Sequence, residues 1–310
     1  MTSIKLFIKE TQQIGPLHVW PLKVTGVSRH TYSVPPFGDK LIFSEYDDGD
    51  GGRVNVIEVH NPTEEDFVIP SGWIVGANLL QVRTFNHSEL VKAGESILAD
   101  VSCVEKGRWG EGQNETDGGR APLSVIGAGW DYDAERKFWV IDRNSRQSRV
   151  WNQVSRQESR SGVRSTSSLQ QIMTEDSEQA AVQSRIQQIS RNSLKIYDEQ
   201  NGFLVAVDGE PLLMEVFSDS RNIEKTIQET IRGISFDIAH LDFEPALDGD
   251  VRRFVEEANL GGLNPIQIDD WASQFAGGNH GVDTKATKDR HGLLIHSISL
   301  NRRHRILMEV

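Results

Sequence analysis

Short apolar segments separated by turn residues fill the first hundred residues of this 310-residue chain, and they constrain its fold most strongly. The clearest pair, DKLIFSEY and RVNVIEVHN, flanks the run DDGDGG. Apolar segments bounded by such turn residues are typical of antiparallel strands joined in hairpins. DDGDGG itself is interpreted as a tight turn, because glycines occupy positions that a calcium loop fills with oxygen ligands. Strands at this spacing predict a sandwich-like, antiparallel and β-rich region over residues 1–106.

The composition changes after residue 106. Residues 107–168 are rich first in glycine and then in arginine and serine, which predicts a loop followed by a flexible or partly helical insert. Residues 169–310 alternate helical and strand patterns, so the chain as a whole is predicted to be an α+β protein. In residues 169–310 the patterns predict a helix over 169–197, a hairpin that turns at Asp208-Gly209, and a helix along Ile223 to Ile238. A further helix is predicted to begin at Asp248 or Asp250, and a short one in IQIDDWASQFA. A closing strand is predicted in HGLLIHSISLN, with RHRILMEV pairing after it.

Charge and composition limit the classes of function. The formal net charge is −12, which repels nucleic acid and anionic membranes unless a local basic patch overrides it. No run of 18 apolar residues is present, so no membrane-spanning helix is predicted. A single cysteine allows no internal disulfide and argues against a structural zinc site. The histidines follow no known metal-ligand spacing and no cofactor motif occurs, so we predict neither a metal nor a cofactor. We expect the protein to be located in the cytoplasm.

The segment VSCVEKGRW contains the only cysteine and the first candidate site. Alternation along a strand places Cys103 among apolar neighbours, so we expect a buried, unreactive thiol. Glu105 continues the same row and precedes Arg108 by three residues. The two residues form either a structural ion pair or a site in which Glu105 is a general acid or base, Arg108 binds an anion and Trp109 stacks on the ligand.

Two further segments carry polar residues with a possible role in binding. Gln81 and Arg83 share one face of a predicted strand, and they meet Glu105 if the two strands pair; the alternative is an exposed sheet face. The loop GVDTKATKDRHGLLIH, which carries Asp283, Lys285 and Lys288 before His296, can close over a site or form an ordinary hairpin.

The region from Arg143 to Arg164 is the one clearly basic stretch, with six arginines and a single acidic residue, Glu158. It can bind phosphates, a nucleotide or RNA. It can equally dock on the acidic surface of the same chain.

The block CVEKGRW resembles the cysteine-valine-glutamate-x-glycine-arginine-tryptophan block of a bacterial family, the ADP-ribosylglycohydrolase- and rhodanese-phosphatase-associated protein domain. Further similar stretches occur in the same order: GPLHVWPL, NPTEEDFVIPSGWIVGANLLQVRT, RVWNQV, GFLVAVDGEPLLMEVF and HGLLIHSISL. The resemblance spans most of the chain, which favours a single large domain over residues 1–310. The resemblance leads us to expect a glutamine-asparagine-arginine triplet at residues 81–83, but Val82 stands in place of the asparagine. This difference weakens the case for a functional role of the triplet.

The resemblance implies an association with systems that process ADP-ribose or nucleotides, in bacterial stress or defence. The leading hypothesis is a non-catalytic accessory module that binds a nucleotide-like or ADP-ribose-type ligand, or a partner protein, through Gln81, Arg83, Arg108 and Trp109. The first alternative is a hydrolase of phosphorylated or ADP-ribosylated substrates with Glu105 as acid or base. The second alternative is RNA binding through Arg143 to Arg164.

Overall fold

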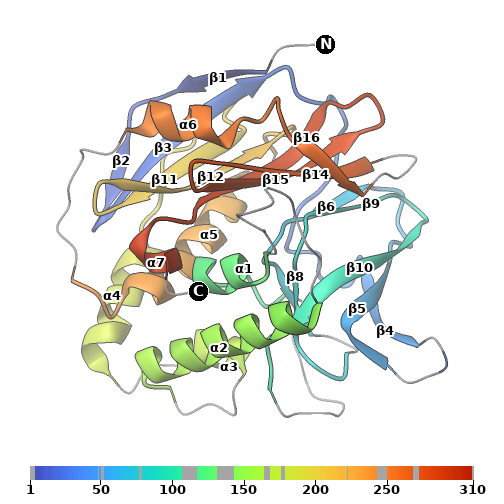
Figure 1. The fold of residues 1–310 in the computed structure, drawn as a ribbon, viewed down its shortest axis with the longest axis horizontal. Coiled ribbons are helices and arrows are strands. Elements are labelled where there is room, and N and C mark those ends of the chain that lie inside the picture. Colours follow the sequence, from blue (N-terminus) through green and yellow to red (C-terminus); the bar gives the residue numbers. More distant parts are fainter. Residues whose placement is uncertain are drawn as a thin grey trace.

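Three antiparallel sheets and seven helices organise the described part of the chain, which confirms the α+β class (Figure 1). The computed structural model describes residues 4–47, 49, 52–76, 79–106, 117–130, 143–163, 168–175, 179–221, 223–242, 250–267 and 272–308. All statements below concern these residues.

A nine-stranded sheet forms the centre of the molecule, in the order β1-β3-β11-β12-β16-β15-β14-β13, with β2 also paired to β3. Its strands are β1 (Lys5–Ile8), β2 (Gln12–Ile14), β3 (Leu17–Thr25), β11 (Gly202–Val207), β12 (Glu210–Phe217), β13 (Asn264–Gln267), β14 (Ala272–Asn279), β15 (Val282–Asp289) and β16 (Leu294–Asn301). The turn between β11 and β12 lies at Asp208-Gly209, as predicted, and both residues have positive φ, which such two-residue hairpins require. Because β3 pairs with β11, the N-terminal strands belong to the same sheet as the C-terminal ones.

One face of this sheet curls around helix α6 (Val251–Ala258), as Figure 1 shows at the top of the molecule. The Asp250 side chain caps the helix by accepting a hydrogen bond from the Arg253 backbone N–H, as the sequence predicted. The core on this face contains Leu204, Met214 and Phe254. Since α6 alone covers the face, the rim of the curled sheet is the natural place for a cavity.

The opposite face is covered by the other helices (Figure 1). They are α1 (Leu123–Ala128), α2 (Arg143–Ser161), α3 (Leu169–Thr174), α4 (Ala180–Ser190), α5 (Ile223–Ile238) and α7 (Arg305–Met308). The predicted isoleucine stripe of α5 is buried in the large core that also contains sheet residues such as Phe203 and Leu213. This face is therefore closed by packing over most of its area.

A second, five-stranded sheet has the order β4-β5-β10-β8-β7 and its own core around Phe43, Ile57 and Phe85. Its strands are β4 (Ile42–Asp47), β5 (Gly52–His60), β7 (Ile74–Val75), β8 (Arg83–Phe85) and β10 (Ser96–Cys103), and beside it β6 (Phe67–Ile69) pairs with β9 (Glu89–Val91). The antiparallel pairing of β4 with β5 confirms the hairpin predicted around DDGDGG.

Three predicted elements are wrong. The helix expected over 169–197 is two helices, α3 and α4, and Ile196 lies beyond α4, because α3 ends at Glu175 in an extended conformation. IQIDDWASQFA contributes to strands β13 and β14 instead of a helix, since pairing with β15 overrides its local pattern. RHRILMEV contains helix α7, because β16 already pairs on both edges, with β12 and β15, and offers no edge to a following strand.

Candidate ligand-binding site

The strand pairing predicted for Gln81, Arg83 and Glu105 is present. Arg83 on β8 lies opposite Cys103 on β10. The Val82 backbone N–H donates to Glu105 Oε2 at 3.2 Å, so Glu105 lies beside the segment that carries Gln81 and Arg83. Arg108 and Trp109 lie outside the described residues.

The three described residues of this predicted site are almost completely buried. Gln81, Arg83 and Glu105 are 2%, 0% and 4% exposed. Arg83 Nη2 lies 3.5 Å from each carboxylate oxygen of Glu45, whereas Arg83 Nε and Nη1 have no acceptor among the described residues. The basic and apolar cavities described below, and a third one beside Pro35 and Trp73, are lined by other residues. The catalytic role of Glu105 and the binding roles of Gln81 and Arg83 stay predictions.

Cys103 is a buried thiol, as the strand alternation predicted. Burial raises its pKa, and its Sγ donates to the Glu105 carbonyl oxygen at 2.9 Å. The Gln147 side chain accepts from the Cys103 N–H and donates to the Cys103 carbonyl oxygen, both at 2.8 Å, and so extends the sheet pairing. These contacts support a structural role, because a reactive cysteine needs a lowered pKa and access.

The arginine-rich segment forms helix α2, and two of its arginines bind the chain itself. Arg146 donates to Asp100 Oδ1 at 2.6 Å, and Arg149 donates to the carbonyl oxygens of Ala128 and Trp130. Burial tends to raise the pKa of Asp100, but His87 and Arg146 outweigh it and lower the pKa to about 2. Arg156 is exposed, and Arg164 lies outside the described residues. Helix α2 therefore packs in part on an acidic residue of its own chain. This agrees with the interpretation that the basic segment docks on the acidic surface of the same chain.

A fully buried ion cluster, which the sequence did not predict, lies under the helical face of the nine-stranded sheet. Arg120 Nη1 lies 2.8 Å from both oxygens of Glu215 on β12, and His296 Nε2 on β16 lies 2.8 Å from Glu215 Oε1. Burial tends to raise the pKa of Glu215, but Arg120 and the hydrogen bond from His296 outweigh it and hold that pKa below its usual value. Burial also lowers the pKa of His296, so a neutral imidazole donates to the carboxylate. Each charge here has a partner, which is the arrangement of a structural cluster.

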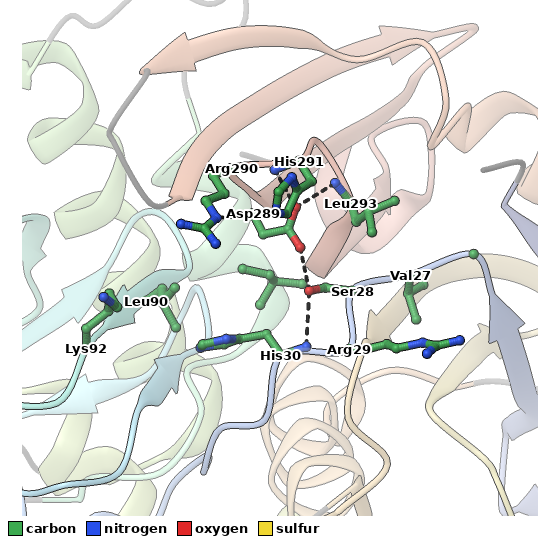
Figure 2. Close-up of a pocket in the computed structure, with 12 residues that line it drawn as sticks. Val27, Ser28, Arg29, His30, Leu90, Lys92, Asp289, Arg290, His291 and Leu293 are labelled. Carbon is green, nitrogen blue, oxygen red and sulfur yellow. Dashed lines mark hydrogen bonds between the residues drawn. The ribbon is translucent and has the colours of Figure 1, made fainter. Parts of the chain in front are cut away.

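A basic cavity of about 510 Å³ opens between the segment after β3, strand β9 and the turn from β15 to β16 (Figure 2). It is lined by three permanently charged cations and two histidines, which are Arg29, Lys92, Arg290, His30 and His291. Figure 2 shows Arg290, Lys92 and His30, from three separate segments, around one opening, whereas the Arg29 side chain extends away from them. Clustering of like charges around a cavity raises the local concentration of anions.

Among the described residues that line the basic cavity, Asp289 is the one carboxylate, and it holds the turn in place. Its Oδ2 accepts from Ser28 Oγ at 2.6 Å, and its Oδ1 accepts from the backbone N–H groups of His291 and Leu293 at 2.9 Å (Figure 2). His30 Nε2 lies 2.6 Å from Asp66 Oδ2, outside the lining. Lys92 Nζ lies 3.8 Å from Glu95 Oε1, and Glu95 does not line the cavity either. The described lining therefore holds three cationic side chains against the single carboxylate of Asp289.

A larger apolar cavity of about 890 Å³ adjoins the basic one at the rim of the curled sheet. Its walls come from β1, α6 and the strands β14 to β16, and they include Leu6, Val255, Phe275 and Leu294. Lys288 also lines it. The two cavities share Gly26, His291 and Leu293 as lining residues, so the turn between β15 and β16 separates them.

The GVDTKATKDRHGLLIH segment is a hairpin whose highlighted residues have separate roles. Lys285 Nζ donates to the Asn86 carbonyl oxygen and His296 joins the ion cluster, while Lys288 faces the apolar cavity. Asp283 lies 3.7 Å from Arg302, and its burial raises its pKa to about 6. The turn of this hairpin, residues 289–293, does border a cavity, but its cationic partners Arg29, His30 and Lys92 lie far away in the sequence. No local pattern could have linked them.

The fold and the cavities define an α+β protein with a basic, ligand-sized cavity and an apolar cavity beside it. Residues 5–291 match the family described as the ARG and Rhodanese-Phosphatase-superfamily-associated Protein domain, and the chain belongs to that family. The resemblance found in the sequence is thereby confirmed. No curated protein and no solved structure matches the chain significantly.

Two negative findings apply to the described residues. None of the helices formed by them is long and apolar enough to cross a membrane. No group of three or more histidine, cysteine, aspartate or glutamate side chains in the described ranges has the geometry to hold a metal ion.

Proposed function

We propose that this protein is an accessory module that binds a phosphate-bearing, nucleotide-like ligand of the ADP-ribose type in the basic cavity. The observation that carries the proposal is the excess of cationic side chains around this cavity in a chain of net charge −12. Arginine and lysine side chains bind phosphate oxygens through charge-assisted hydrogen bonds, and arginine can do so with two parallel bonds. The family name, which refers to ADP-ribosylglycohydrolases, supports an ADP-ribose-type ligand.

The size of the cavity supports a small molecule as the ligand. A volume of about 510 Å³ lies within the range of roughly 300–1,000 Å³ that is usual for small-molecule sites. The Ser28–Asp289 hydrogen bond ties the segment after β3 to the turn, and the His30 backbone N–H donates to Ser28 Oγ at 3.2 Å. A pre-formed site of this kind loses little entropy when a ligand binds.

The other hypotheses have less support from the geometry. A hydrolase with Glu105 as acid or base requires that a substrate reach a residue that is 4% exposed. The RNA hypothesis depends on arginines of α2, two of which already bind the chain itself. A partner protein is the remaining alternative ligand for the same basic surface.

Isothermal titration with ADP-ribose, NAD and ADP tests the proposal on the wild-type protein and on Arg290→Glu. Charge reversal at Arg290 removes one charge-assisted hydrogen bond and adds repulsion. Such bonds contribute roughly 1.5–3 kcal/mol, so affinity should fall by about tenfold or more.

Arg156→Glu is the matched control, because Arg156 is an exposed arginine on α2, which contributes no residue to the basic cavity. It carries the same change of net charge and should leave the affinity unchanged. The proposal fails if none of the three ligands binds the wild-type protein, or if both variants weaken binding equally. In the second case the effect is one of overall charge and the site lies elsewhere.

A further inference from the structure

Lys288 is a buried cation in the apolar cavity. It is 8% exposed, lies near the end of β15 and lines the cavity. Strand alternation places it on the same face as Ala286, which belongs to the core beneath α6. Its Nζ lies 4.5 Å from the centroid of the Phe275 ring. Among the described residues, no carboxylate and no hydrogen-bond acceptor bonds to this ammonium.

The Lys288 side chain is largely buried, and its ammonium keeps contact with solvent only through the cavity. The group has three N–H donors, and a phenyl face offsets only part of its lost hydration. Burial accordingly lowers the pKa of Lys288. The cavity therefore offers a hydrogen-bond donor among apolar walls, and a ligand with an acceptor at this depth would satisfy it.

The position of Lys288 relative to the basic cavity suggests that both cavities bind one ligand. His291 and Leu293 line both cavities, and they belong to the same short turn as Arg290. Phosphates bound on the basic side of this turn would leave the rest of the ligand at the entrance to the apolar side. There, Phe275 provides an aromatic face and Lys288 a donor.

We propose that the ligand of the basic cavity spans both cavities and is a nucleoside diphosphate, with its base against Phe275 and an acceptor atom of that base bonded to Lys288. This inference rests on the proposed function and specifies its ligand. A nucleobase is flat and carries ring nitrogens or carbonyl oxygens, so it satisfies both the aromatic face and the ammonium. A phosphorylated alkyl chain would fill the apolar volume and leave Lys288 without an acceptor. Lys288 is thus a specificity-determining residue.

Comparing ADP with inorganic pyrophosphate tests this directly, because the two share the diphosphate and only ADP has a base. In calorimetric titrations of the wild-type protein, ADP should bind at least about tenfold more tightly than pyrophosphate. Lys288→Met keeps the length and apolar stem of the side chain and removes the donor, so most of that difference should vanish. Pyrophosphate affinity should stay the same, and Lys225→Met, an exposed lysine on α5, should behave as wild type.

Each outcome separates the two proposals. If ADP and pyrophosphate bind equally well, or if Lys288→Met leaves their difference unchanged, the spanning ligand is overturned while the basic cavity stands. If neither binds, this inference fails, and the proposed function fails with it if ADP-ribose and NAD do not bind either. Should Lys288→Met not fold, the wild-type protein still gives a test by reductive methylation. ADP should then protect Lys288 and pyrophosphate should not, and equal labelling with both ligands would overturn the inference.

Discussion

The buried charged residues on the two faces of the nine-stranded sheet differ in whether they have a partner of opposite charge. On the helical face, Arg120, Glu215 and His296 are completely buried and matched to one another. On the face covered by α6, Lys288 is 8% exposed, lines a cavity and is matched by no anion among the described residues. Six of the described helices and a large core close the first face around the ion cluster, whereas the short helix α6 leaves a cavity on the second.

This difference indicates which buried charges hold the fold and which are available to a ligand. Removing one partner of a matched cluster leaves an uncompensated charge in the core, so the loss should appear as instability. Removing an unmatched charge should stabilise the fold and weaken binding instead. Burial alone does not distinguish these two cases; the presence of a partner does.

The largest effect is expected for Arg120→Met on the helical face. This variant leaves the Glu215 carboxylate buried with only a neutral histidine beside it, which should reduce the free energy of unfolding by about 3–5 kcal/mol. Chemical denaturation measures the loss. Arg253→Ala is the control, because it removes the exposed arginine of a surface pair with Glu257 on α6 and should cost under about 1 kcal/mol. Equal losses in the two variants would remove the distinction between buried and exposed pairs.

A pH-dependent effect of intermediate size is expected for Asp237, also on the helical face. Burial raises its pKa to about 6, although its carboxylate accepts hydrogen bonds from Ser124 and Gln157. Between pH 4 and 6 the folded protein therefore keeps a proton that the unfolded chain has lost, so unfolding releases a proton and is favoured as pH rises. The contribution of Asp237 to the free energy of unfolding should fall by roughly 3 kcal/mol between pH 4 and 6 and stay constant above pH 6. The figure follows from a pKa difference of about two units, since each unit corresponds to about 1.4 kcal/mol.

The difference in unfolding free energy between the wild-type protein and Asp237→Asn, measured from pH 4 to 7, isolates this contribution. Asparagine does not titrate, so other groups cancel in the difference. A difference that is independent of pH, or one that grows with pH, would show that the carboxyl is not held in its protonated form.

The smallest effect is expected for Lys288→Met without a ligand. Replacing an unmatched buried ammonium by an apolar side chain of similar length should raise the free energy of unfolding by on the order of 1 kcal/mol. Thermal unfolding at neutral pH measures the change. A clear loss of stability would mean that Lys288 is matched within the protein, and the contrast between the two faces would disappear.

The sequence predicted most elements of this fold from local patterns. The hairpin at Asp208-Gly209, the α5 stripe and the Asp250 cap each depend on neighbouring residues, and the structure contains all three. The helix predicted in IQIDDWASQFA and the strand predicted in RHRILMEV are wrong because their outcome depends on which sheet edges are free, and no local pattern contains that information. The single helix predicted over 169–197 is wrong because the chain becomes extended at Glu175.

The same reasoning explains the outcome for the sites. Strand alternation placed Glu105 beside the segment of Gln81 and Arg83, because the two strands are neighbours in the sheet as well as close in the chain. The basic cavity joins residues near 30, 92 and 290, and the ion cluster joins Arg120, Glu215 and His296. Such sets arise only when distant segments fold together, so no local pattern in the sequence could group their members.

A crystal structure of the protein with bound ADP-ribose is the most direct test of the central claim, that the basic cavity is the ligand site. The account predicts the diphosphate within hydrogen-bond distance of Arg290 or Lys92 and the adenine against Phe275. Density for the ligand beside Arg83 and Glu105, or along the exposed arginines of α2, would contradict it.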